Sequence, residues 1–369
     1  MPYSAFPDLW EYLKHTNKHI VMYGMGNGAD KILAVAQAKG IEIEDFFASD
    51  GFVRGHSFHS KRVLSYSEAK EKYGACNMIV LLSFATSLPD VMQTILRVAD
   101  ECELYAPDVP VFGDNLFDAE FYASHKSDFD AARDLLADEE SARVFDHIIR
   151  YKLTGDLKFL LEIQNDPDES FGQILPCNNF RVAVDLGAYN GDSARALAPY
   201  AKNLQTLYAL EPDARNYRKL CAYAETEERF KIVSLQCAAW NEDTTLTFDA
   251  SGNRNAGAMQ NTSTVLQART GKVTEVQARS VDSVLGGAGC DYIKFDVEGS
   301  EEQALQGCRA TIAKFSPALL VSCYHRSEDL YALPLLVKSL CPQYALYLRR
   351  FPYFPAWDIN LYAISGDKM

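Results

Sequence analysis

A strand, a glycine-containing turn and the start of a helix follow one another over residues 181–198, and this stretch most constrains the fold. A short apolar run ends on Asp185, Gly187 and Gly191 carry the backbone through the turn, and an alanine-rich helical segment follows. Glycine is needed where the backbone takes a positive φ or approaches a ligand closely, and a helix start leaves N–H groups without partners. The pattern predicts a ligand-binding turn.

Two carboxylates distinguish this turn from a dinucleotide-binding loop. Asp185 ends the first strand in a DxGxxxG pattern, and the next run, Thr206–Leu210, is followed by Glu211. An ionised Glu is an acceptor-only group, so Glu211 suits the hydroxyls of a ribose. Asp185 would repel pyrophosphate but would tolerate an ammonium or a sulfonium, and S-adenosylmethionine carries both. The alternative for each carboxylate is a structural role at a strand end.

Composition narrows the class of protein. The chain has 369 residues, 48% of them hydrophobic and 23% charged, which suits two globular domains. The net charge of -14 disfavours a nucleic-acid partner. Nine cysteines without CxxC spacing indicate buried free thiols in a reducing cytoplasm. No run approaches the ~20 apolar residues of a membrane helix, so we expect a protein that does not span a membrane.

The N-terminal part predicts a second nucleotide-binding-type unit. A GxGxxA loop at Gly24–Ala29 follows an apolar run, Asp50 lies where the ribose-binding acid of such units is found, and Met78–Leu82 is a continuous apolar strand. We expect Leu104–Phe112 to close a Rossmann-like domain over residues 1–115. The loop could bind a nucleotide or a nucleotide sugar, or the unit could be a scaffold that docks partners or presents an acceptor.

Residues 116–170 predict a helical connector, and residues 171–369 predict a second α/β domain. In that domain Thr244–Phe248 and Val273–Gln277 alternate polar and apolar residues, which indicates an antiparallel pair flanking a polar loop at 251–263. The last two strands, within 344–364, have no helix between them and predict a hairpin. A parallel sheet that ends in one reversed strand is the class I methyltransferase order.

Five motifs in the second domain resemble those of the FkbM family of S-adenosylmethionine-dependent methyltransferases. They are VDLGAYNGD (184–192), LEPD (210–213), RSVD (279–282), YIKFDVEGSE (292–301) and YH (324–325). The resemblance covers about 175–365. It implies O-methylation of a hydroxyl on a sugar, a glycan or a related natural product, with a small-molecule or glycan acceptor. A homo-oligomer is compatible with it.

The resemblance also implies which residues bind S-adenosylmethionine. Those expected to contact the cofactor are Asp185, Gly187, Ala188, Tyr189, Asn190, Gly191, Asp192, Glu211, Pro212, Ala238, Ala239 and Asp296.

The expected catalytic residues are His325, Asp296 and Glu298. His325 follows the fifth strand, at the edge where ligands of α/β sheets bind, and its ordinary near-neutral pKa favours a general base. It could instead be a histidine hydrogen-bonded at a strand end. The two carboxylates could contact the cofactor, act as a base, or hold a metal with His325, and Glu298 could cap the next helix. The spacing is not diagnostic of a metal, and we predict none.

Two other functions compete with methyl transfer. An NAD(P)- or nucleotide-sugar-binding oxidoreductase would use the loop at Gly24–Ala29, but this function would give Asp185 and Glu211 no role. A non-catalytic scaffold would not need the intact glycine turn or the two acids. Arg254 and Arg326 could grip an acidic acceptor, although arginines of this kind are more often solvated.

Overall fold

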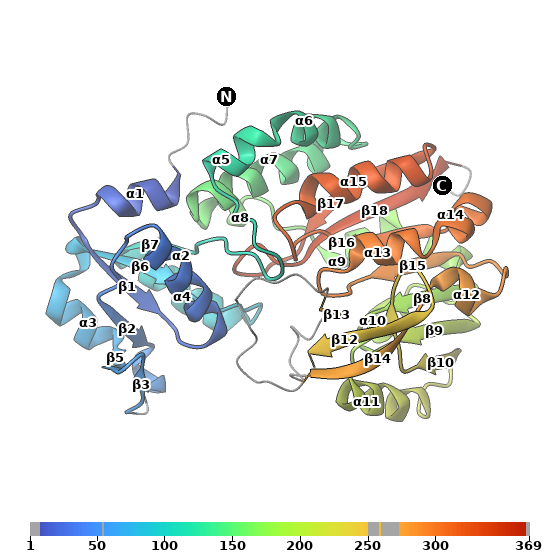
Figure 1. Cartoon of the computed structure of the whole chain (residues 1–369), viewed down its shortest axis with the longest axis horizontal. Coiled ribbons are helices and arrows are strands. Elements are labelled where there is room, and N and C mark those ends of the chain that lie inside the picture. Colours follow the sequence, from blue (N-terminus) through green and yellow to red (C-terminus); the bar gives the residue numbers. More distant parts are fainter. Residues whose placement is uncertain (1–7, 54, 250–257, 260–272, 367–369) are drawn as a thin grey trace.

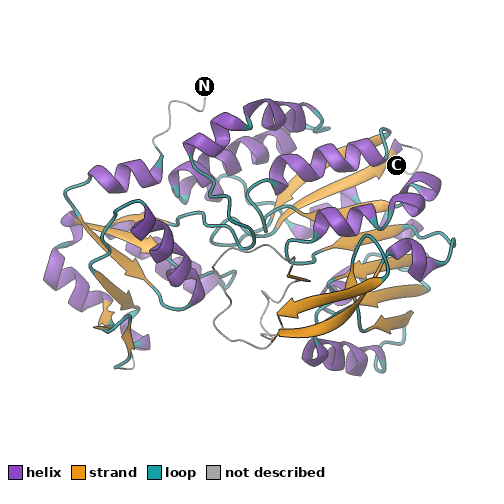
Figure 2. Ribbon diagram, viewed as in Figure 1, coloured by secondary structure: helices purple, strands orange, loops and turns teal. Residues whose placement is uncertain are grey.

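The chain forms two α/β units joined by helices, as a computed structural model shows (Figure 1). The structure describes residues 8–53, 55–249, 258–259 and 273–366. Helices surround both sheets (Figure 2). The predicted domain limits at 115 and 170 fall between the two sheets and remain predictions.

The N-terminal unit is built on a parallel sheet. Within the described residues the strand order is β5-β2-β1-β6-β7, and every neighbouring pair is parallel. Its strands are β1 (His19–Tyr23), β2 (Asp45–Ala48), β5 (Leu64–Ser65), β6 (Met78–Leu82) and β7 (Glu103–Tyr105). All five residues of β6 are buried, as a central parallel strand covered on both faces requires. This sheet is compatible with the predicted Rossmann-like unit.

Helices cover this sheet, and the last strand is shorter than expected. The helices are α1 (Leu9–His15), α2 (Asn27–Ala38), α3 (Tyr66–Tyr73) and α4 (Pro89–Glu101). The segment Leu104–Phe112, which we expect to close the unit, is a strand only as far as Tyr105. Pro107 and Pro110 have no N–H to donate to a neighbouring strand, so the chain leaves the sheet there.

The segment predicted to be a helical connector contains a series of helices. They are α5 (Ala119–Ser124), α6 (Lys126–Asp134), α7 (Glu139–Thr154) and α8 (Lys158–Leu161). Asp138 caps α7 by accepting from Ser141 N–H, and Gly155 ends it in the left-handed conformation. The Ser141 hydroxyl accepts a hydrogen bond from the Leu348 N–H at 2.9 Å. The connector therefore packs on the edge of the C-terminal sheet.

The C-terminal sheet has the predicted methyltransferase order. Among the described residues it has seven strands in the order β10-β9-β8-β15-β16-β18-β17. They are β8 (Val182–Leu186), β9 (Thr206–Leu210), β10 (Lys231–Leu235), β15 (Tyr292–Phe295), β16 (Ala318–Ser322), β17 (Tyr344–Arg350) and β18 (Ile359–Ser365). Strand β18 runs antiparallel to both of its neighbours. The terminal hairpin is therefore confirmed, and its reversed strand lies inside the sheet rather than at the edge.

A smaller sheet lies beside this one. Strands β12 (Thr244–Asp249) and β14 (Val273–Arg279) pair antiparallel, as predicted, and β11 (Ala238–Ala239) and β13 (Ala258–Met259) extend the sheet. The polar loop predicted over 251–263, which includes Arg254, lies outside the described residues apart from β13.

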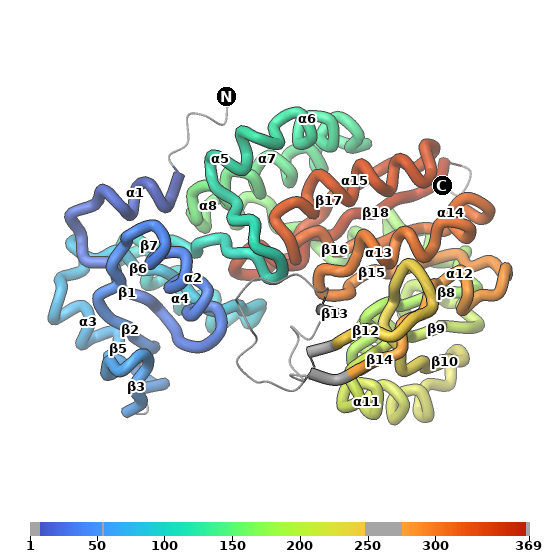
Figure 3. The backbone as a smooth tube through the Cα atoms, viewed as in Figure 1, coloured from blue at the N-terminus to red at the C-terminus, as the bar shows by residue number. Residues whose placement is uncertain are grey.

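The segment after β7 joins the two units. It runs from the N-terminal sheet to the C-terminal unit (Figure 3), where the Phe112 N–H donates to the His325 carbonyl at 2.9 Å. A second junction pairs Thr86 with Phe354 through reciprocal backbone hydrogen bonds of 2.7 and 2.9 Å. The N-terminal unit is thus held against the carboxyl ends of the C-terminal strands.

The cysteines and the helices bear on the predictions of free thiols and of a chain that does not span a membrane. All nine cysteines are free, and seven are buried; Cys221 is half-buried and Cys76 is exposed. None of the helices in the described ranges is both long and apolar enough to cross a bilayer.

Candidate functional site

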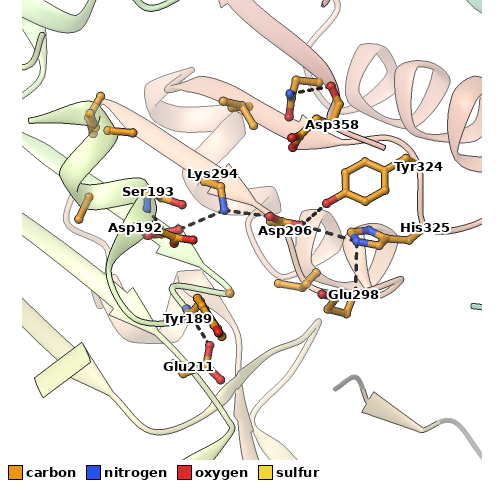
Figure 4. Close-up of a pocket in the computed structure, with 18 of the residues that line it drawn as sticks. Tyr189, Asp192, Ser193, Glu211, Lys294, Asp296, Glu298, Tyr324, His325 and Asp358 are labelled. Atoms are coloured by element: carbon orange, nitrogen blue, oxygen red, sulfur yellow. Dashed lines mark hydrogen bonds and ion pairs between the residues drawn. The ribbon is translucent and has the colours of Figure 1, made fainter. Parts of the chain in front are cut away.

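A cavity of about 480 Å³ opens at the carboxyl ends of β8, β9, β15 and β16. This is where the strand order of the C-terminal sheet reverses, between β8 and β15, and ligands of open α/β sheets bind at such a point. Asp185 and Glu211 both line it. The two carboxylates that the sequence singled out therefore share one cavity, in which Figure 4 labels Glu211.

The turn after β8 needs glycine at two positions. Gly187 has φ +80°, and a Cβ there would lie 1.9 Å from the Asp296 carbonyl oxygen. Gly191 has φ +85° and precedes helix α10 (Asp192–Leu197). Any side chain at Gly187 would therefore push β8 away from the segment that carries Asp296.

Asp185 is buried in a position suited to a positively charged ligand. Its side chain is 3% exposed, and neither carboxylate oxygen has a hydrogen-bond partner among the described residues. Its nearest counter-charge is the Lys294 ammonium, 3.7 Å away. Burial raises the pKa of Asp185 to about 6, although Lys294 opposes the shift. Its free oxygens can accept hydrogen bonds from an ammonium.

Glu211 is held in a fixed orientation by the backbone. Its oxygens accept from the Tyr189 N–H and the Asp213 N–H, both at 2.8 Å. Burial raises its pKa to about 7, and these two hydrogen bonds limit the shift. Each carboxylate oxygen has a second lone pair, so Glu211 can still accept from ribose hydroxyls.

Lys294 is a site residue that the sequence reasoning missed. It lies on β15 with its ammonium 3.7 Å from Asp185 and 3.2 Å from Asp296. Burial alone would lower the pKa of Lys294, but the two carboxylates raise it above its ordinary value. A lysine within the apolar run Tyr292–Phe295 was the signal that could have found it, because a buried lysine needs a counter-charge.

His325, Asp296 and Glu298 come together on the wall opposite Glu211 (Figure 4). The His325 Nε2 atom lies 3.4 Å from Glu298 Oε2 and 3.6 Å from Asp296 Oδ1. The Tyr324 hydroxyl donates to Asp296 Oδ1 at 3.3 Å. The three expected catalytic residues therefore form one cluster.

The charges in this cluster differ from the expectation. Burial alone would lower the pKa of His325, but the nearby carboxylates, chiefly Glu301 and Glu298, raise it to about 10. Burial raises the pKa of Glu298 to about 8, and burial of Asp296 is outweighed by Lys294 and His325, which lower its pKa. The expectation that His325 has a near-neutral pKa, which favoured it as the general base, is therefore wrong. Four carboxyl groups surround the imidazole, those of Asp296, Glu298, Glu301 and Asp329.

Two of those carboxyl groups escaped the sequence reasoning. Glu301 begins helix α13 (Glu301–Gln306), is 1% exposed, accepts from the Val297 N–H at 2.9 Å and lies 2.9 Å from His325 Nδ1. Asp329 begins α15 (Asp329–Leu340) and accepts from the Arg326 N–H at 2.7 Å; burial raises its pKa to about 7. Glu301 ends the motif that carried the family resemblance, which was the available signal.

Most of the expected cofactor residues line the cavity. Those that do are Asp185, Gly187, Tyr189, Asp192, Glu211, Pro212, Ala238, Ala239 and Asp296. Ala188, Asn190 and Gly191 belong to the same turn but are not part of the lining. Ala188 packs under the turn against Ala209 and Leu220. Arg326 is not in the lining either, and its Nε donates to the Gly299 carbonyl at 2.7 Å.

Aromatic side chains and the N-terminal unit complete the walls. Tyr324, Tyr353 and Trp357 line the cavity, and the Trp357 ring centroid lies 6.4 Å from that of Tyr324 and 5.6 Å from that of Tyr353. Ser87 and Val111 contribute from the N-terminal unit. The sequence reasoning singled out Tyr324 in the YH motif, but it could not indicate the others, because they come from segments far apart in the chain.

The GxGxxA loop has packing reasons for its glycines. A Cβ at Gly24 would lie 2.6 Å from the Phe84 ring, and one at Gly28 would lie 2.2 Å from the Ser83 carbonyl oxygen. Asp50 accepts from the N–H and the hydroxyl of Ser67. These contacts give Gly24, Gly28 and Asp50 structural roles, whereas Gly26 has a φ of +105° and open space around it, and the predicted nucleotide site stays a prediction.

A family model and several solved structures are similar to parts of this chain. Residues 185–350 match the model of the methyltransferase FkbM domain. A solved methyltransferase FkbM from Methylobacillus flagellatus KT is 20% identical with a TM-score of 0.69, over 94% of this chain and 90% of that one. A fibrillarin from Aeropyrum pernix, solved with S-adenosyl-L-methionine, is 13% identical with a TM-score of 0.33, over 52% of this chain and 69% of that one. No curated protein sequence matches significantly.

Proposed function

Since residues 185–350 are an FkbM methyltransferase domain, this chain is an S-adenosylmethionine-dependent methyltransferase, and we propose that it methylates a hydroxyl of a sugar, a glycan or a related natural product. One observation carries the proposal. Asp185 and Glu211 line the same cavity as Asp296, Glu298 and His325, so a cofactor pocket and a proton-accepting cluster meet in one space.

The residues around the glycine turn fit the cofactor. The free oxygens of Asp185 suit its ammonium, and Glu211 suits its ribose. Ala238 and Ala239, which form β11 shortly after β10, would lie along the adenine. When bound, S-adenosylmethionine supplies a methyl group on a positively charged sulfur. The excess of carboxylates on the cavity wall favours that positive charge.

We assign the acceptance of the proton to Glu298. Its pKa of about 8 lies close to the pH at which a base is both ionised in part and strong enough to act. As the acceptor oxygen gains the methyl carbon, its proton would pass to the Glu298 carboxylate. His325, with its raised pKa, would carry positive charge and orient Glu298 and Asp296 through its Nε2 contacts.

The aromatic wall supports a sugar-like acceptor. Tyr324, Tyr353 and Trp357 offer flat apolar faces, and Asp358 and Asn360 add polar groups beside them. Pockets that combine such faces with a few polar groups orient a polar ligand while burying its apolar face.

The experiment that tests the proposal is isothermal titration with S-adenosylhomocysteine and, separately, NAD. We expect saturable binding of S-adenosylhomocysteine to the wild type and at least about tenfold weaker binding to Asp185→Asn, because a charged hydrogen bond is lost. Asp166→Asn, a cap of the short helix α9 (Pro167–Glu169), serves as the control. Binding of NAD alone would contradict the proposal. The acceptor is then sought by transfer of a labelled methyl group to sugars and glycans.

A further inference from the structure

A second cavity, of about 270 Å³, lies at the carboxyl ends of β1 and β6 in the N-terminal unit. Its wall includes residues 25, 27 and 28 after β1, Leu82 at the end of β6, and residues 83–85 after β6. The strand order of this sheet reverses between β1 and β6, because β2 lies on one side of β1 and β6 on the other. This is the position at which open parallel sheets bind ligands.

The two cavities adjoin each other. Val111 and Trp357 line both of them, Val111 from the segment after β7 and Trp357 from the loop before β18. The cofactor cavity also lies where its own sheet reverses. The ligand-binding edges of the two sheets therefore meet at this pair of side chains, and one molecule could extend from one cavity into the other.

Lys31 is the cation of the second cavity. It lies on α2, lines the cavity, and donates to the Pro110 and Val111 carbonyls at 2.9 and 2.5 Å. These carbonyls use two of its three protons. In the part of the chain that the structure describes, Lys31 has no ion pair with a carboxylate. The other charged lining residue, Asp108, pairs with Lys152 at 2.9 Å.

The charge of Lys31 therefore lacks compensation within the cavity. Burial lowers its pKa to about 8, and only the attraction of Glu298, from the neighbouring cavity, opposes the shift. A buried charge without a counter-charge is unfavourable, and an anionic ligand group would supply one.

We propose that the second cavity binds an anionic group of the methyl acceptor, held by the Lys31 ammonium, while the hydroxyl to be methylated lies in the first cavity. The acceptor would thus be an extended molecule with a phosphate or carboxylate at its far end. That the bound anion belongs to the methyl acceptor rests on the proposed function. The existence of an anion site in the second cavity does not depend on it.

Titration of the S-adenosylhomocysteine-saturated protein with inorganic phosphate, and separately with acetate, tests this inference. Saturation with S-adenosylhomocysteine blocks the cofactor pocket. We expect saturable binding of at least one anion by the wild type and by Lys31→Arg. Lys31→Met should bind that anion at least about tenfold more weakly than the wild type, because a charged hydrogen bond is lost. Lys70→Met, at a half-buried lysine paired with Glu101 on the same unit, should bind the anion like the wild type. Which anion binds distinguishes a phosphate from a carboxylate.

No saturable binding of either anion by the wild type, or undiminished binding by Lys31→Met, would overturn the inference. If Lys31→Met does not fold, Ala85→Phe decides, because it fills the cavity and leaves the Lys31 contacts in place. Anion binding unchanged in Ala85→Phe would also overturn it. Absence of S-adenosylhomocysteine binding would contradict the proposed function instead. The failure of the anion site and the failure of the proposed function can therefore be distinguished.

Discussion

Cofactor affinity should fall as the pH is lowered through about 7, because Glu211 must be ionised to accept the ribose hydroxyls. Burial raises its pKa to about 7. A carboxyl with this pKa is about 90% ionised at pH 8 and about 10% at pH 6. If only the ionised form binds, the dissociation constant of S-adenosylhomocysteine rises about tenfold between these pH values. At pH 5 the loss approaches about a hundredfold.

Isothermal titration between pH 8 and pH 6 measures this directly. Binding that selects the ionised carboxyl releases close to one proton at pH 6, which titrations in buffers of different ionisation enthalpy detect. At pH 8, Glu211→Gln should bind S-adenosylhomocysteine between about tenfold and a hundredfold more weakly than the wild type, because charged hydrogen bonds are lost. The dissociation constant of this variant should show no step near pH 7. Asp185→Asn removes the carboxyl whose pKa is about 6 but leaves Glu211 in place, so this variant should keep the step near pH 7.

Two results would refute this reasoning. One is a wild-type dissociation constant that changes less than about twofold between pH 8 and pH 6. The other is a Glu211→Gln variant that keeps the wild-type pH dependence, which would assign the titration to another group.

Four other predictions rest on the same geometry. Glu298→Gln should lower turnover about 10²–10⁴-fold with little change in cofactor affinity. Wild-type turnover should rise as the pH rises through about 8, the pKa of Glu298. A Glu298→Gln variant as active as the wild type would exclude Glu298 as the base. Because the pKa of Glu298 is raised in the folded state, its contribution to stability is present at low pH and lost as the pH rises through about 8. Glu298→Gln should therefore raise the melting temperature at pH 9 and not at pH 4, and an equal shift at both would contradict the burial argument. Glu301→Gln should lower the pKa of His325, seen by NMR of the imidazole, whereas Glu302→Gln, at the exposed neighbouring position, should not. Gly187→Ala should lower the melting temperature and abolish S-adenosylhomocysteine binding, while Gly172→Ala, with open space around it, should do neither.

The central turn could be predicted from the sequence because its determinants are local. An apolar run, an acid at its end and two glycines specify the path of the backbone within a few residues, and both glycines have the positive φ expected. The strands of the C-terminal sheet followed from apolar runs in the same way. The segment Leu104–Phe112, expected to close the N-terminal unit, is a strand only as far as Tyr105, because Pro107 has no N–H to donate to a neighbouring strand.

The sequence by itself determined which side chains end the strands, and so which chemistry could gather at one edge of the sheet. Only the tertiary structure decided their charge. Glu301 and Glu298 reach the imidazole of His325 from a different segment, and the pKa of a buried group depends on every charge within a few ångströms. The meeting of Lys31 and Trp357 at adjoining cavities was likewise decided by the packing of two units, because 326 residue positions separate them and no local pattern links them.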